Sequence, residues 1–165
     1  MQFVSVWLII ALGDVLAQTI PPQNVRDYFY ALPERFFEIP KERNRNEWML
    51  SHQESVVDLS NGYLFAQGDG AQASIWVCLF KKTDGKPLIA VQTTAGDTDE
   101  ITYLFFYLYE HGKWKDVTKE TLPVKHNEQY RYSLPRYGQT IKVTTPRGKK
   151  LYDWEWNNEK FLLKK

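Results

Sequence analysis

Three acidic side chains that stand close together in the chain are the first candidates for chemistry. Asp97, Asp99 and Glu100 occupy a polar stretch between two apolar runs. Carboxylate oxygens at positions i, i+2 and i+3 are ligands that Ca²⁺ prefers, so this stretch could hold a calcium ion. The complete EF-hand loop pattern is absent, and acidic loops between strands are commonly solvated turns. We therefore favour a solvated loop and keep the metal site as the alternative.

Aromatic side chains form a second candidate group. Tyr152, Trp154 and Trp156 alternate with acidic residues, so they would share one face of a strand. If exposed, such a stripe stacks on sugar rings or grips a peptide; if buried, it is core. Burial is favoured because acidic residues take the opposite face, whereas Tyr137, at the tip of a turn, is expected to be exposed. The candidate binding residues are Tyr109, Trp114, Tyr137, Tyr152, Trp154 and Trp156.

Residue types used in catalysis are present, but no motif groups them. There is no GxSxG sequence, and His52, His111 and His126 are scattered without an HExxH pattern or a Cys/His pair. Cys78, the single cysteine, lies in an apolar run and is predicted to be a core residue with an inaccessible thiol. A carboxylate pair for acid–base catalysis depends on geometry that a sequence does not contain. The sequence therefore assigns no catalytic residue and no cofactor.

The composition is that of an ordinary globular domain with little net charge. The chain has 165 residues, of which 43% are hydrophobic and 25% are charged, and this suits one domain. Aromatic residues make up 15%, and sheets favour them because they fit a pleated, half-buried surface. The formal net charge is +1. A charge so near zero gives no electrostatic footprint for nucleic acid or an anionic membrane.

The N-terminus has the pattern of a secretory signal peptide, which we place at residues 1–17. The run Phe3–Leu12 has no charge, has the length of a signal-peptide apolar region, and is too short to span a bilayer. Small residues in Val15–Ala17 fit a cleavage site before Gln18, although the segment before the run lacks Lys and Arg. The alternative is a buried N-terminal strand or helix. We expect a secreted or periplasmic protein whose mature chain has no transmembrane segment.

Residues 18–53 are predicted to be a helical N-terminal segment. A proline pair precedes apolar residues at the spacing of one helix face. This stripe consists of Val25, Tyr28, Phe29 and Leu32. A second helix is predicted over the polar run 41–47, and Arg43 and Arg45 are expected to face solvent because acidic residues lie beside them.

Residues 54–165 are predicted to form an antiparallel β domain, organised around the stretch 73–118. That stretch holds four strand-like runs, three of them apolar on both faces, and such strands have to be covered on both faces. From residue 130 onward, apolar and polar residues alternate, which indicates strands with one buried face. Hairpin turns are predicted at Asn61-Gly62 and Asp84-Gly85.

Together these patterns predict an α+β fold. We expect a bent antiparallel sheet of about nine short strands in meander order, with two or three short N-terminal helices packed on it as part of the same globular domain. A closed or half-open barrel is the rival architecture.

The leading functional hypothesis is a small exported bacterial domain that binds a ligand or a protein without catalysis. The partner would be a peptide, a protein, a glycan or a small apolar ligand, and nucleic acid is not expected. The alternative is a hydrolase that uses His or carboxylate groups in a sheet-lined pocket. A concave pocket that contains a strongly perturbed titratable group would favour the enzyme, and a pocket lined by aromatic and aliphatic groups would favour binding.

Overall fold

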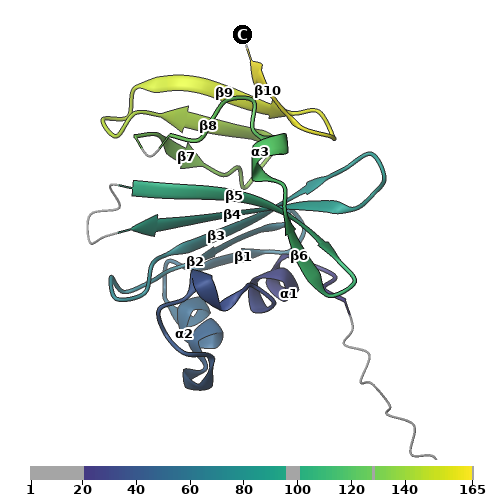
Figure 1. The fold of residues 1–165 in the computed structure, drawn as a ribbon. Helices are drawn as coiled ribbons and strands as arrows, with labels where there is room; N and C mark the ends of the chain where they lie inside the picture. Colours follow the sequence, from purple (N-terminus) through teal and green to yellow (C-terminus); the bar gives the residue numbers. More distant parts are fainter. Residues whose placement is uncertain (1–20, 96–100, 128, 165) are drawn as a thin grey trace, which may run out of the picture.

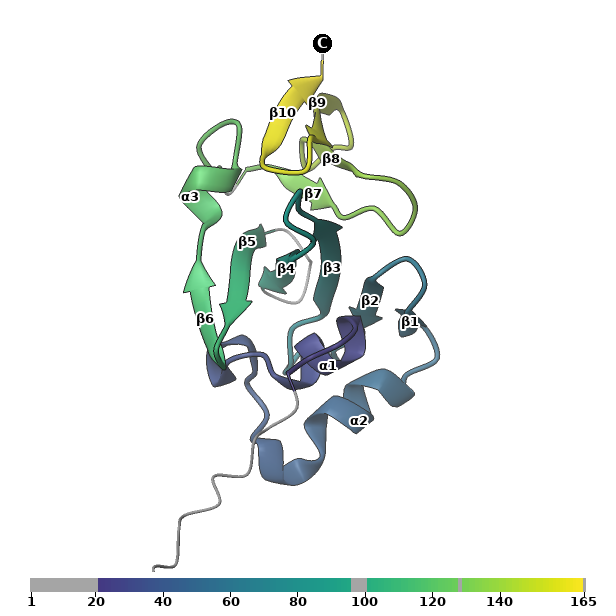
Figure 2. The same ribbon diagram turned by 90° about the vertical axis from the view of Figure 1, so that its right-hand side faces the viewer.

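The protein consists of two antiparallel sheets and short helices, arranged in layers (Figures 1 and 2). A computed structural model describes residues 21–95, 101–127 and 129–164. In Figure 2, α1 and α2 cover one face of the first sheet and β7 to β10 cover the other. The predicted α+β class and antiparallel meander are confirmed. The single bent sheet is replaced by two open sheets, and no closed barrel forms among the described residues.

Strand order follows chain order within each sheet. The first sheet contains β1 (Val56–Asp58), β2 (Tyr63–Ala66), β3 (Ile75–Lys81), β4 (Pro87–Ala95), β5 (Ile101–Glu110) and β6 (Lys113–Asp116). The second contains β7 (Arg131–Ser133), β8 (Thr140–Thr144), β9 (Lys150–Trp156) and β10 (Phe161–Lys164). The helices are α1 (Val25–Tyr30), α2 (Arg45–Ser51), α3 (Thr118–Thr121) and the 3₁₀ turns η1 (Glu34–Phe36) and η2 (Lys41–Arg43). Within the described ranges, no helix has the length and apolar character needed to cross a membrane.

The central strands are covered on both faces, as the sequence predicts. Ile75 and Val77 of β3 point to the helices, whereas Cys78 and Phe80 point to the second sheet. Phe80 is only 2% exposed, and it packs edge-on against Phe161 of β10 with ring centroids 4.9 Å apart. Two hydrophobic cores therefore share the first sheet as their common wall.

The predicted turns are confirmed where glycine is needed. Gly62 and Gly85 have φ angles of 62° and 82°, a left-handed conformation that glycine adopts without steric cost. Gly62 ends the β1–β2 turn and Gly85 lies in the β3–β4 turn. These turns fix the registers that place Val57 opposite Leu64 and Cys78 opposite Ala90.

The first helix is confirmed, together with its apolar stripe. Asn24 caps α1, because its side-chain oxygen accepts hydrogen bonds from the backbone N–H groups of Arg26 and Asp27 at 3.0 and 3.2 Å. The stripe is buried, as expected for Val25, Tyr28, Phe29 and Leu32. Helix α3, a single turn after β6, was not predicted from the sequence.

Arg45 corrects the prediction of a solvated polar run. Arg43 is exposed as expected, but Arg45 is 2% exposed. Its guanidinium forms a two-pronged ion pair with Glu34, donates to the carbonyl oxygen of Ile39 at 3.1 Å, and lies 3.7 Å from the Phe37 ring centroid. A buried arginine is stable when its fork is paired in this way. The partners come from residues 34–39, outside the charge pattern around Arg45 itself.

Candidate functional site

The structure distributes the predicted aromatic residues among three places. Trp154 and Trp156 are 0% and 4% exposed, in the core between the sheets. Tyr152, on the same strand, is half-buried beside Tyr130 with ring centroids 6.0 Å apart. This part of the stripe is therefore mainly core.

The other three aromatic candidates lie away from that stripe. Tyr109 of β5 and Trp114 of β6 lie on the helix-facing side of the first sheet, where the Trp114 indole N–H donates to the carbonyl oxygen of Ala31 at 3.0 Å. Tyr137 is 69% exposed at the turn tip, with the guanidinium carbon of Arg136 5.3 Å from its ring centroid. The six residues thus do not converge on one surface.

Among the described residues, neither metal-ligand types nor the single cysteine form an assembled site. Asp97, Asp99 and Glu100 lie outside the described residues, and in the described part of the chain no three His, Cys, Asp or Glu residues are grouped to hold a metal ion. Cys78 is buried as predicted, and burial raises the pKa of its thiol to about 12. A thiol of this kind remains protonated at neutral pH and is a poor nucleophile.

The three histidines lie on separate elements. His52 follows α2 and stacks edge-on against Trp48 with ring centroids 4.6 Å apart. His111 occupies the β5–β6 turn with a φ angle of 51°. His126 lies in the connection after α3, where its ring stacks against Tyr103 and Tyr132. These positions are too dispersed for the His residues to act together.

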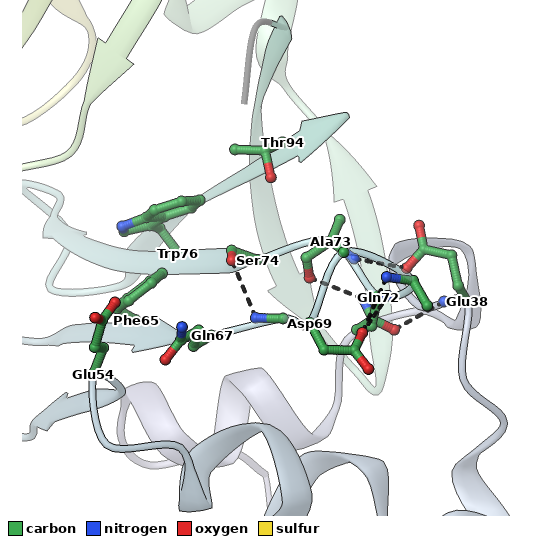
Figure 3. Close-up of a pocket in the computed structure, with 13 residues that line it drawn as sticks. Glu38, Glu54, Phe65, Gln67, Asp69, Gln72, Ala73, Ser74, Trp76 and Thr94 are labelled. Carbon is green, nitrogen blue, oxygen red and sulfur yellow. Dashed lines mark hydrogen bonds between the residues drawn. The ribbon is translucent and has the colours of Figure 1, made fainter. Parts of the chain in front are cut away.

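Two clefts of ligand size are the remaining candidates. The first, which we call the acidic cleft, has a volume of about 640 Å³ and surrounds the loop between β2 and β3 (Figure 3). It is lined by Glu38, Glu54, Phe65, Gln67, Gly68, Asp69, Gly70, Ala71, Gln72, Ala73, Ser74, Trp76 and Thr94. The loop contributes most of these residues, so the shape of the cleft depends on what fixes the loop.

Gln72 anchors the loop to the segment after η1. Its side chain is 0% exposed, and its amide oxygen accepts from the backbone N–H groups of Glu38 and Ile39 at 2.9 and 3.3 Å. Its amide nitrogen donates to the carbonyl oxygen of Ala73 at 3.0 Å. A fully buried glutamine with paired donors and acceptors orders the backbone around it.

Gly68 allows the loop to close on itself. Its N–H donates to the Ser74 hydroxyl at 3.1 Å, and a Cβ atom at this position would lie 1.8 Å from the carbonyl oxygen of Gln72. Any side chain would therefore push the two arms of the loop apart. Asp69 completes the turn by accepting from the N–H groups of Ala71 and Gln72 at 3.1 and 3.0 Å.

An aromatic pair borders the acidic cleft. Phe65 and Trp76 face each other across β2 and β3, with ring centroids 4.6 Å apart and an interplanar angle of 25°. Both rings are half-buried and line the cleft. The cleft thus combines an aromatic surface with carboxylate, amide and hydroxyl groups.

The second cleft, which we call the edge cleft, lies between β5 and the connection that follows β6. Its volume is about 1040 Å³, and its lining is more apolar than that of the acidic cleft. It is lined by Tyr103, Leu104, Phe105, Asp116, Thr118, Lys119, Glu120, Leu122, Pro123, Val124, Lys125 and His126. The charged residues include both signs.

The edge cleft lies beside the part of β5 that β6 does not pair with. Strand β6 pairs only with Tyr107–Glu110 of β5. At Phe106 the carbonyl oxygen still accepts from Val117 N–H at 2.9 Å, and the N–H donates to the Thr118 hydroxyl at 2.9 Å. The chain then turns into α3 and leaves the strand.

The edge groups without a backbone partner belong to Thr102 and Leu104, which are buried at 4% and 1% exposed, and the Thr102 hydroxyl donates to the carbonyl oxygen of Tyr130 at 3.0 Å. Alternate residues of a strand direct their N–H and C=O groups to the same edge, so these two residues face the same side as Phe106. No described residue forms a backbone hydrogen bond with them on that side. The sequence contained a signal that part of β5 would lack a partner strand. The strand-like segment before the Glu110-His111-Gly112 turn is much longer than the one after it.

Comparison of the chain with protein-family models, curated proteins and solved structures finds no match.

Proposed function

We propose that this protein is an exported binding domain that adds an extended peptide segment to the free edge of β5. The observation that carries the proposal is that, among the described residues, Thr102 and Leu104 have no backbone hydrogen-bond partner on the outer side of β5, beside an apolar cleft. Peptide recognition by strand addition draws affinity from main-chain hydrogen bonds and specificity from pockets for alternate side chains. The edge cleft offers both kinds of contact.

The walls of the cleft suit a peptide strand. Tyr103 and Phe105 supply aromatic surface from β5, and Leu122 and Val124 supply aliphatic surface from the connection. A volume of about 1040 Å³ lies at the upper end of the range of about 300–1,000 Å³ for ligand pockets. Basic and acidic side chains at the rim suit a polypeptide better than a ligand with a single charge sign.

The composition of the edge also supports binding. Exposed strand edges are commonly protected by Lys, Pro or bulges that prevent pairing with other chains. The half of β5 beside the edge cleft reads Ile-Thr-Tyr-Leu-Phe-Phe, with no Lys or Pro, and the connection that lines the cleft lies beside it. At the opposite edge of the same sheet, β1 is only three residues long. A strand edge without Lys or Pro next to a cleft suits a strand-accepting site, and a bound peptide would take the place of the connection beside it.

We place the protein outside the cytoplasm, in the periplasm or secreted. The support is the leader pattern of residues 1–17, with its charge-free run and small residues before Gln18. Mass spectrometry of exported protein should find Gln18 as the first residue. Intact Met1 in the exported material would contradict this part of the proposal.

Amide exchange tests the binding site directly. The Thr102 and Leu104 amides are buried but lack a backbone acceptor among the described residues. We expect them to exchange faster than the paired amides of β5 in the free protein and to become protected when a peptide binds. Ligands should come from a displayed library of random peptides, and each selected peptide should lose binding when its backbone is N-methylated at alternate positions. Slow exchange of both amides in the free protein, or unchanged exchange in the complex, would refute the site.

A matched pair of proline substitutions locates the binding surface. Pro123→Arg introduces a long charged side chain into the edge cleft and should weaken peptide binding by about tenfold or more, which corresponds to about 1.4 kcal/mol. Pro146→Arg makes the same change at the exposed β8–β9 turn and should leave binding unchanged. Equal binding by both variants would place the peptide elsewhere.

A further inference from the structure

The acidic cleft has charge of one sign only. Glu38, Glu54 and Asp69 line it, and no Lys, Arg or His does. Two of these carboxylates also support the protein: Glu38 accepts from the Ala73 N–H at 3.2 Å and Asp69 caps its turn. The Glu54 carboxylate has no hydrogen-bond partner among the described residues and is exposed. A negative cleft attracts cations and repels anions.

The aromatic pair adds a second kind of cation recognition. The face of an aromatic ring carries negative potential, and an ammonium group within about 6 Å of the ring centroid is attracted to it. Phe65 and Trp76 stack on each other and remain half-buried at the border of the cleft. Their apolar surface also suits the carbon frame of an organic cation, which a bare metal ion lacks.

Thr94 supplies an independent indication of a ligand. Its side chain is 7% exposed, and in Figure 3 its hydroxyl points toward the cleft. Within the described residues, this hydroxyl has no hydrogen-bond partner, although the backbone carbonyl of Thr94 accepts from Thr93. The rest of the side chain is buried, but the hydroxyl oxygen itself is accessible from the cleft, so it can hydrogen-bond to a bound molecule.

We propose that the acidic cleft binds an organic cation, a small molecule with an ammonium group on a carbon frame. Glu54 faces the ammonium group, and Phe65 and Trp76 contact the carbon frame. The Thr94 hydroxyl hydrogen-bonds to a polar group of the ligand. This site is separate from the edge cleft and does not depend on the peptide proposal.

Three sugars that share the glucose ring but differ in charge test whether the site requires a positive charge on its ligand. Glucosamine should bind, and glucose and glucuronate should bind at least about tenfold more weakly, because only glucosamine carries the ammonium group. Spermidine and choline serve as cations without a sugar ring. Binding should be followed by calorimetry and by chemical shifts of the Gln67 and Thr94 amides, and it should weaken as salt rises. Glucose binding as tightly as glucosamine, or no binding of any cation, would overturn the proposal.

Substitutions locate the contacts. Glu54→Gln should weaken glucosamine or spermidine binding about two- to fivefold, and Trp76→Leu about two- to thirtyfold. Glu155→Gln is the same type of substitution on the exposed face of β9, and it should leave cation binding unchanged. Since Trp76→Leu also removes core contacts, Glu54→Gln is the deciding variant, and unchanged cation binding in it would refute the site. Pro123→Arg should retain cation binding, which separates this result from that of the edge cleft.

Discussion

Gln72→Leu should destabilise the protein more than any other glutamine substitution in the β2–β3 loop. Leucine cannot accept from the N–H groups of Glu38 and Ile39, and it cannot donate to the carbonyl oxygen of Ala73. Each group left without a partner in a buried setting costs about 1–3 kcal/mol. These groups are partly buried, so the lower part of that range applies, and the added apolar surface offsets about 1 kcal/mol. We expect a net loss of about 2–4 kcal/mol in the free energy of unfolding.

Gln67→Leu is the matched control for this prediction. Gln67 lies in the same loop, is half-buried, and its side chain has no hydrogen-bond partner among the described residues. Its replacement should change the free energy of unfolding by less than about 0.5 kcal/mol. Urea unfolding followed by tryptophan fluorescence measures both variants, with similar m-values expected. Equal stability of the two variants would mean that the Gln72 amide does not hold the loop, and the account of the acidic cleft would fail with it.

Three further predictions concern the cores and the surface. Trp154→Ala should lower the free energy of unfolding by about 3–5 kcal/mol, whereas Tyr137→Ala should change it by less than about 0.5 kcal/mol; urea unfolding of both checks this. Cys78, buried with a raised thiol pKa, should resist iodoacetamide in the native state and react after unfolding, and rapid native labelling would contradict its placement. Hydrogen bonds from Arg136 and neighbouring groups lower the pKa of Asp58, so its stabilising contribution should be lost as the pH falls below about 4. Asp58→Asn should therefore lose less free energy of unfolding than the wild type on acidification, and an identical pH profile would argue against the pairing.

Local sequence patterns predicted the parts of the fold that depend on local geometry. Gly62 and Gly85 have the positive φ angles that their turns require, and the apolar stripe of α1 is buried. Period-two alternation correctly indicated strands with one buried face after residue 130. The same alternation occurs in one bent sheet and in two stacked sheets, so it could not reveal that the hydrogen-bonded ladder ends after β6.

The candidate sites depend on contacts that are distant in the sequence. Arg45 is buried because η1 brings Glu34 and Phe37 against it, and its neighbours in the chain gave no sign of this. Phe65 and Trp76 become a pair only through the β2–β3 register. The aromatic stripe of β9 is mainly core, as the acidic residues on its opposite face indicated, and the high aromatic content of this chain reflects two cores, each of which contains large side chains.

The location of both clefts follows from the layered architecture. Helices cover one face of the first sheet and the second sheet covers the other, so the middle of β3 and β4 is closed to ligands. Access is left at the places where cover or pairing stops. One is the free half of β5, because β6 is shorter than its partner; the other is the β2–β3 loop at the end of the sheet. Substitutions in the aromatic cores should therefore alter stability, and changes in ligand binding should map to these two margins of the first sheet.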